Sequence, residues 1–195
     1  FGYFARKNKN NPCLIGEAGV GKTSVAKMYA LNQNQYENKL YFRCGENIDE
    51  ILNSMQDINY ESTLIIVDDI PSVSIFVATP TYKLLKTLHG VHIILISRDD
   101  FFYPTDFFVI KIHGISLSET KAYLQYLLDD EIYNNYDLIN EIYGCTNGNI
   151  LAIRLLCVYI QNSGESIYNV IASLKTLDVN NILYKREYVK DIDSS

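Results

Sequence analysis

The chain has 195 residues, a formal net charge of −6 and a hydrophobic content of 48%. This hydrophobic content is enough for a packed core and argues against wholesale disorder. The acidic balance argues against broad nucleic-acid binding, which normally uses a basic face. The four cysteines show no metal-ligand spacing, and no apolar run is long enough to cross a bilayer. We therefore expect reduced thiols, a cytoplasmic location and no membrane or nucleic-acid partner.

Strand and helix patterns alternate along the first part of the chain. Short, continuously apolar runs predict strands at 12–15, 40–44, 64–68, 91–97 and 107–112. Helical periodicity falls between them at 23–32, 47–56 and 81–88. Alternation of this kind predicts an α/β domain in which helices cover both faces of a parallel sheet.

The pattern changes after His113, where only helical periodicity remains. We expect helices at 118–129, 135–143, 149–161, 165–176 and 180–187, with Ser118 as the first N-cap. The predicted organisation is an α/β domain over residues 1–113 and a helical subdomain over residues 114–195. Because the chain starts without methionine close to its first strand, we expect a fragment of a larger protein.

Residues 16–23 read Gly-Glu-Ala-Gly-Val-Gly-Lys-Thr, a complete G-x-x-x-x-G-K-[ST] (Walker A) motif between a predicted strand and a predicted helix. The glycines let successive backbone N–H groups point at a phosphate, and the helix start adds the positive end of its dipole. Lys22 would reach the β- and γ-phosphates, and Thr23 would offer its hydroxyl to Mg²⁺. The alternative is a glycine-rich turn with Lys22 solvated. The predicted nucleotide-binding residues of this segment are Gly16, Glu17, Ala18, Gly19, Val20, Gly21, Lys22, Thr23 and Ser24.

A second motif is the apolar run that ends in Asp68 and Asp69. In P-loop NTPases the carboxylate at such a strand end helps to hold the Mg²⁺ that the loop threonine also binds, a role that falls to Asp68. Asp69 would orient the attacking water. Because Asp is shorter than the Glu found there in many fast ATPases, we expect slow hydrolysis. The alternative is that the pair only caps or solvates the strand end.

A third candidate is Arg98, which follows the strand predicted at 91–97. A residue at the end of a strand beside the phosphate-loop strand can reach the γ-phosphate, where an arginine would stabilise the charge. The alternative is a surface arginine paired with Asp99 or Asp100. The candidate catalytic residues are thus Lys22, Asp69 and Arg98, and the candidate Mg²⁺ ligands are Thr23 and Asp68.

With three motifs in order, residues 11–177 resemble the STAND branch of the P-loop ATPases, and most of all its NB-ARC module. LIIVDDI is similar to that module's strand with two terminal acidic residues, and HIILISRDD to its strand ending in a sensor arginine, which supports Arg98. GCTNGNILAIRLL resembles its Gly-Leu-Pro-Leu-Ala motif, whose proline packs near adenine; Ile150 stands at that position and is the implied adenine contact. The resemblance implies a three-layer fold with strand order 5-1-4-3-2 and a helical lid.

The phosphate loop and its approach, RKNKNNPCLIGEAGVGKTSVA, also resemble the first ATPase domain of Clp-type AAA+ unfoldases. Our first hypothesis is an ATP/ADP-binding signalling switch, a weak Mg²⁺-dependent ATPase that acts through other protein domains or subunits, with nucleotide-dependent self-association. One alternative is a Clp-like protein-remodelling ATPase, and another is a non-hydrolysing ADP-binding interaction module. Adenine follows from the resemblance and from the lack of an Asn-Lys-x-Asp sequence for guanine.

Overall fold

The computed structural model describes residues 11–46, 50, 51, 53, 55, 58–88, 90–98, 107–128, 136–164, 166, 168, 169 and 172. Contacts divide the chain into two compact units, described separately below. One unit contains the sheet and its helices, and the other contains the helices after His113 together with Ala18–Gly21. The helix predicted at 180–187, and most of those predicted at 47–56 and 165–176, lie outside the described residues.

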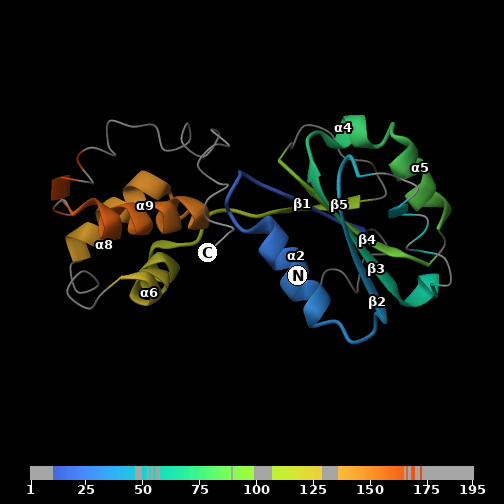
Figure 1. The fold of residues 1–195 in the computed structure, drawn as a ribbon, viewed down its shortest axis with the longest axis horizontal. Coiled ribbons are helices and arrows are strands. Elements are labelled where there is room, and N and C mark those ends of the chain that lie inside the picture. Colours follow the sequence, from blue (N-terminus) through green and yellow to red (C-terminus); the bar gives the residue numbers. More distant parts are fainter. Residues whose placement is uncertain are drawn as a thin grey trace. The chain divides into compact units, whose positions relative to one another are not determined.

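The first unit is built on a five-stranded parallel sheet (Figure 1). Its strands are β1 (Asn11–Ile15), β2 (Asn38–Arg43), β3 (Thr63–Ile70), β4 (His92–Ser97) and β5 (Phe107–Lys111). They lie in the order β2-β3-β4-β1-β5, and every adjacent pair is parallel. The predicted order, 5-1-4-3-2, is the same sheet listed from its other edge, so the fold prediction is confirmed.

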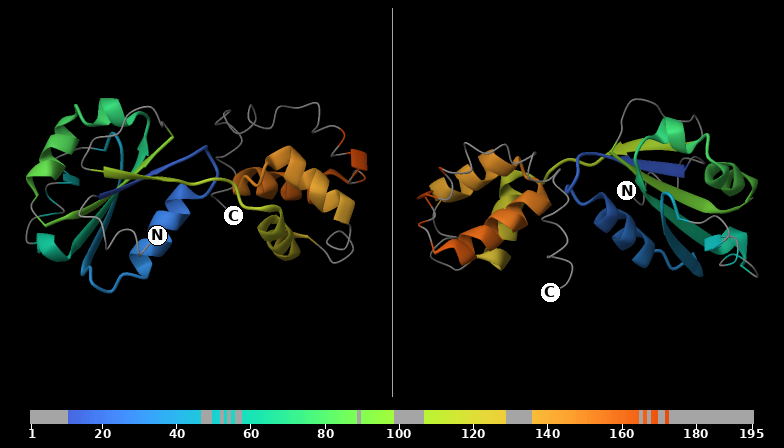
Figure 2. Two further views of the ribbon diagram at one scale, coloured as in Figure 1. Left: turned by 180° about the vertical axis from the view of Figure 1, so that it is seen from behind. Right: turned by 45° about the horizontal axis from the view of Figure 1, so that its top comes forward.

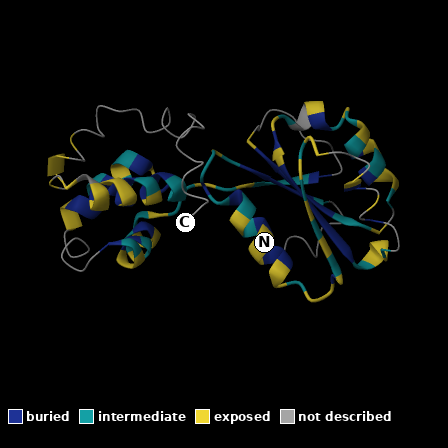
Figure 3. Ribbon diagram, viewed as in Figure 1, coloured by how far each residue is buried: buried dark blue, intermediate teal, exposed yellow. Residues whose placement is uncertain are grey.

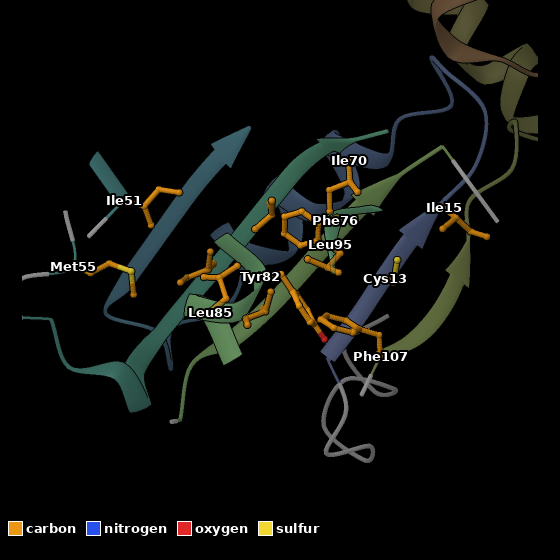
Figure 4. Packing of buried hydrophobic residues seen from close by; sticks show 13 residues of the cluster. Cys13, Ile15, Ile51, Met55, Ile70, Phe76, Tyr82, Leu85, Leu95 and Phe107 are labelled. Atoms are coloured by element: carbon orange, nitrogen blue, oxygen red, sulfur yellow. The ribbon is translucent and has the colours of Figure 1, made fainter. Parts of the chain in front are cut away.

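The central strands bury side chains on both faces of the sheet, as their continuously apolar sequences predict. Along β3, Ile65 and Val67 pack into one core cluster while Leu64 and Ile66 pack into the other. Strands β1 and β4 alternate in the same way between the two clusters. Figure 3 shows these strands as the most completely buried part of the unit, and Figure 4 shows the first cluster from close by.

Different helices cover the two faces (Figures 1 and 2). Helix α2 (Lys22–Leu31) packs Ala26, Tyr29 and Ala30 against one face. Helices α4 (Val73–Phe76) and α5 (Pro80–Thr87) cover the other face with Phe76, Tyr82 and Leu85. A short 3-10 turn, η1 (Tyr60–Ser62), leads into β3. The result is the three-layer arrangement that the alternating pattern predicts.

The second unit contains α6 (Leu117–Leu127), α8 (Tyr136–Thr146) and α9 (Ile150–Ser163) around a separate apolar core. The prediction that Ser118 caps the first of these helices is wrong, because Ser116 is the N-cap. The Ser116 hydroxyl accepts from the Glu119 N–H at 3.3 Å, and the Glu119 carboxylate accepts from the Ser116 N–H at 2.7 Å. This Ser-x-x-Glu capping box is visible in the sequence and outweighs the single serine beside Glu119. Over the described part of the chain, no helix combines the length and apolarity needed to cross a bilayer.

Two backbone segments of the second unit, at Ile115 and at Gly148, cross at close range. The Ile115 N–H donates to the Gly148 carbonyl at 2.8 Å. Gly148 has φ +71, and a Cβ built on it would overlap the Ile115 carbonyl oxygen. Gly148 is therefore required both by its backbone conformation and by the space around it.

Gly148→Ala should destabilise the second unit by at least about 2 kcal/mol, because it adds both backbone strain and a steric overlap. Gly144→Ala is the matched control, since Gly144 is an exposed residue of α8 with nothing within 4 Å of a Cβ. That control should stabilise the helix by about 0.5–1 kcal/mol. Denaturant unfolding followed by circular dichroism measures both, and equal effects of the two substitutions would contradict the crossing.

Candidate phosphate-binding site

The predicted phosphate loop joins β1 to α2, with Lys22 as the first residue of the helix. Gly19 has φ +81 and Gly21 has φ +96, backbone conformations that residues with a Cβ rarely adopt. Glu17 and Ser24 are exposed, whereas Val20 is buried. The glycines of the motif thus bend the backbone between strand and helix as the sequence predicts.

The Lys22 side chain folds back onto the loop instead of extending into solvent. Its Nζ donates to the Gly16 carbonyl at 2.8 Å and to the Glu17 carbonyl at 2.7 Å, and only 8% of the residue is exposed. Burial, and next the Arg98 guanidinium, lower the pKa of Lys22, while the nearby carboxylates oppose that shift. A partly desolvated ammonium forms stronger hydrogen bonds with an anionic oxygen than with neutral carbonyls. An anion that replaced the two carbonyls would therefore stabilise the Lys22 side chain.

The Asp68 carboxylate accepts three hydrogen bonds near the loop. Its Oδ2 accepts from the Thr23 hydroxyl at 2.7 Å and from the Tyr41 hydroxyl at 2.8 Å. Its Oδ1 accepts from the Asp69 N–H at 2.7 Å. Asp68 is only 7% exposed, so these three donors replace water around the carboxylate. Thr23 and Asp68 are hard oxygen donors in contact, which fits a Mg²⁺ ion that takes its other ligands from water and phosphate.

An irregularity in β3 turns the two aspartates in different ways. The pairing of β3 with β4 shifts register between Val67 and Ile70, and Asp69 has φ +58. A bulge of this kind re-aims side chains at the end of a strand. It leaves Asp68 buried and Asp69 exposed.

The Arg98 guanidinium lies 3.8 Å from the Asp69 carboxylate, and both side chains are more than half exposed. The structure thus brings two of the three predicted catalytic side chains together at the carboxyl ends of β3 and β4. The alternative partners of Arg98, Asp99 and Asp100, lie outside the described residues.

The middle of the loop, Ala18–Gly21, groups with the helical unit because the start of α9 holds it. The Asn149 Nδ2 donates to the Ala18 carbonyl at 2.7 Å, and the Leu151 N–H donates to the Gly19 carbonyl at 3.2 Å. A Cβ at Gly21 would lie 3.4 Å from Ile150 Cδ1. Ile150, the predicted adenine contact, is therefore a neighbour of the loop.

Two residues of this site were missed by sequence reasoning. Tyr41 lies on the same face of β2 as Arg43, whose register partner is Asp68, so only the strand order and register reveal its contact. Burial and the hydrogen bond to Asp68 raise the pKa of the Tyr41 hydroxyl, which keeps it a donor. Asn149 could have been recognised as an N-cap from its position before an apolar helical pattern, but nothing local indicates its bond to Ala18.

Comparison with solved structures identifies the architecture. A mutant of RuvB from Thermotoga maritima superposes with a TM-score of 0.59 over 87% of this chain and 63% of that one, at 11% identity. A STAND protein with a tetratricopeptide repeat sensor from Pyrococcus horikoshii gives a TM-score of 0.54 over 85% of this chain and 30% of that one, at 15% identity. The chain has the fold of the P-loop ATPases. At these identities the likeness concerns the fold, which AAA+ and STAND proteins share.

Sequence comparison adds two short matches. A segment of 23 residues, 12% of this chain, is 74% identical to the chaperone protein ClpC2 of Arabidopsis thaliana. A segment of 37 residues, 18% of this chain, is 57% identical to the ATP-binding subunit ClpE of the Bacillus subtilis Clp protease. The matches span only 2% and 5% of those two proteins. No family model matches the chain.

Tyr41→Phe should weaken Mg²⁺ binding at the Thr23–Asp68 pair by about tenfold, because it removes an outer donor that orients the Asp68 carboxylate. Tyr60→Phe is the matched control, since Tyr60 is an exposed tyrosine of the same unit. Isothermal titration calorimetry with Mg²⁺ measures the effect. An unchanged Mg²⁺ affinity would show that Tyr41 has no part in orienting the carboxylate.

Proposed function

We propose that the chain is an ATP- and ADP-binding molecular switch of the STAND/NB-ARC type, with slow Mg²⁺-dependent hydrolysis. The observation that carries this proposal is the 2.7 Å hydrogen bond between Thr23 and Asp68. It joins the last residue of the phosphate-loop motif to the carboxylate at the end of β3, the pair that P-loop NTPases use for Mg²⁺. Either motif without this contact would be weaker support for a Mg²⁺-nucleotide site.

The loop supplies the groups that a nucleoside di- or triphosphate needs. Backbone N–H groups of Gly16–Gly21 and the start of α2 would bind the phosphates, with Lys22 exchanging its two carbonyl partners for phosphate oxygens. Thr23 and Asp68 would hold Mg²⁺, which when bound neutralises charge on the phosphates. Ile150, beside Gly21, would pack against adenine through apolar contact.

Asp69 and Arg98 fit a slow hydrolase and a nucleotide sensor. Asp69 is exposed and short, so it would orient the attacking water less firmly than a longer carboxylate. Its ion pair with Arg98, at 3.8 Å between half-exposed side chains, is weak. A γ-phosphate would therefore compete for Arg98, so that ATP and ADP favour different arrangements of this side chain. Other domains or subunits would respond to that difference, including through self-association.

A specific observation also favours the second candidate, a protein-remodelling AAA+ ATPase. The segment matched to ClpC2 is 74% identical, although it covers 12% of this chain. That function requires rapid turnover and ATP-dependent rings, whereas the switch requires retained ADP and slow turnover. Size-exclusion chromatography with ATP, together with a steady-state rate, separates the two.

Lys22→Ala should abolish nucleotide binding, because it removes the ammonium that meets the β- and γ-phosphates. We expect the wild-type protein to carry near-stoichiometric ADP, released by denaturation and identified by chromatography, and the Lys22→Ala protein to carry none. Lys83→Ala removes the same charge from an exposed position of α5 and should leave the bound ADP unchanged. Equal nucleotide content in both variants would overturn the assignment of the loop.

Asp69→Asn should slow ATP hydrolysis at least about tenfold while leaving the ATP dissociation constant within about twofold, because it removes the carboxylate that orients water. Asn tolerates the left-handed conformation of this position as well as Asp does, so the backbone is preserved. Single-turnover hydrolysis and equilibrium binding give the two numbers. Wild-type turnover in this variant would remove Asp69 from the mechanism.

A further inference from the structure

Both polar atoms of the Asn149 side chain form hydrogen bonds. Its Oδ1 accepts from the Ala152 N–H at 3.2 Å and so caps helix α9. Its Nδ2 donates to the Ala18 carbonyl at 2.7 Å, across 131 residues of sequence. The residue is only 5% exposed, so neither bond is shared with bulk solvent. An N-cap alone requires only the oxygen, and the amide nitrogen is thus available for a second task.

The bond to Ala18 fixes the direction of a neighbouring N–H group. The peptide bonds of the described chain include no cis bond, and a trans peptide places its C=O and N–H on opposite sides. With the Ala18 carbonyl facing Asn149, the Gly19 N–H points away from the start of α9. The Leu151 N–H likewise donates to the Gly19 carbonyl. The Val20 N–H, on the opposite side of that peptide, therefore also points away from the start of α9. Successive N–H groups on one side of a bent backbone form an anion-binding concavity.

The start of α9 lies so close to the loop that there is no room for a side chain at Gly19. A Cβ on Gly19 would lie 2.6 Å from Asn149 Oδ1 and 2.7 Å from Leu151 Cβ. Gly19 therefore serves a contact with the helix as well as a positive φ. Two hydrogen bonds join the loop to the start of α9, and both lie within the second unit.

We propose that Asn149 is a positioning residue for phosphate binding, which aims the Gly19 and Val20 N–H groups at the diphosphate that ATP and ADP share. This inference rests on the proposed nucleotide-binding function. It assigns the α9 start a role toward the phosphates, separate from the adenine contact of Ile150. Both nucleotides carry a β-phosphate. Loss of the Asn149 side chain would therefore lower the affinities for ATP and ADP by the same factor, and the ratio of the two affinities would not change.

Asn149→Asp separates the two tasks of the side chain. Asp caps helices as well as Asn does, so the Oδ1 bond to Ala152 is kept. The Nδ2 donor becomes an oxygen that repels the Ala18 carbonyl. Asn147→Asp is the matched control for charge, because Asn147 is exposed, lies two residues away and has φ +48, which Asp tolerates. Asn149→Ser is the neutral version, since its hydroxyl can cap the helix but is too short to reach Ala18.

The dissociation constants of ADP, ATP and inorganic pyrophosphate should rise by a common factor of about ten in Asn149→Asp and Asn149→Ser. Isothermal titration calorimetry measures them at a temperature where each variant is folded, which denaturant unfolding of the nucleotide-free protein establishes, because loss of the buried bond to Ala18 also lowers stability. Asn147→Asp should bind all three as the wild type does. Pyrophosphate is the deciding probe, because it carries no base and reports on the loop alone.

Wild-type binding in both Asn149 variants, with binding lost in Lys22→Ala, would overturn the positioning role and leave the proposed function intact. Weaker binding of ADP with unchanged binding of pyrophosphate would also overturn it, by placing the effect at the base. So would weaker binding in Asn149→Asp with wild-type binding in Asn149→Ser, since the new carboxylate would then repel the phosphates and the Nδ2 bond to Ala18 would have no part in the effect. Wild-type binding in Lys22→Ala would instead reject the nucleotide function itself.

Discussion

Two hydroxyl groups and one backbone amide converge on the carboxylate of Asp68, and the arrangement of the site depends on this convergence. The Thr23 bond ties the start of α2 to the end of β3, while the Tyr41 bond ties β2 to the same oxygen. These contacts depend on the parallel direction of β1, β2 and β3, whose carboxyl ends lie at one edge of the sheet. A buried carboxylate without these donors would be costly, so the groups that hold Asp68 also stabilise the fold.

Much of this arrangement follows from local sequence. Continuous apolar runs marked all five strands, and the glycines with Lys22 and Thr23 marked the loop, because these features depend only on neighbouring residues. The contacts of Tyr41 and Asn149 could not be predicted from local sequence. The first joins residues 27 positions apart, and the second joins residues 131 positions apart. The N-cap at Ser116 differs from these contacts, because it follows from the local Ser-x-x-Glu spacing to Glu119, which outweighs the single serine at position 118. The roles of Lys22, Asp68, Asp69, Arg98 and Ile150 in catalysis and binding stay predictions.

Each unit also contains one deeply buried thiol. Cys13 lies in the sheet core at 0% exposure and Cys157 in the helical core at 2%, and burial raises the pKa of each thiol to about 12. A thiol that is both covered and protonated does not react with alkylating reagents until its surroundings open. Cys44 and Cys145 are only half-buried, so they would be modified first. The rates of alkylation at Cys13 and Cys157 therefore report separately on the opening of the two units, and nucleotide that rigidifies one unit without the other would slow one rate alone.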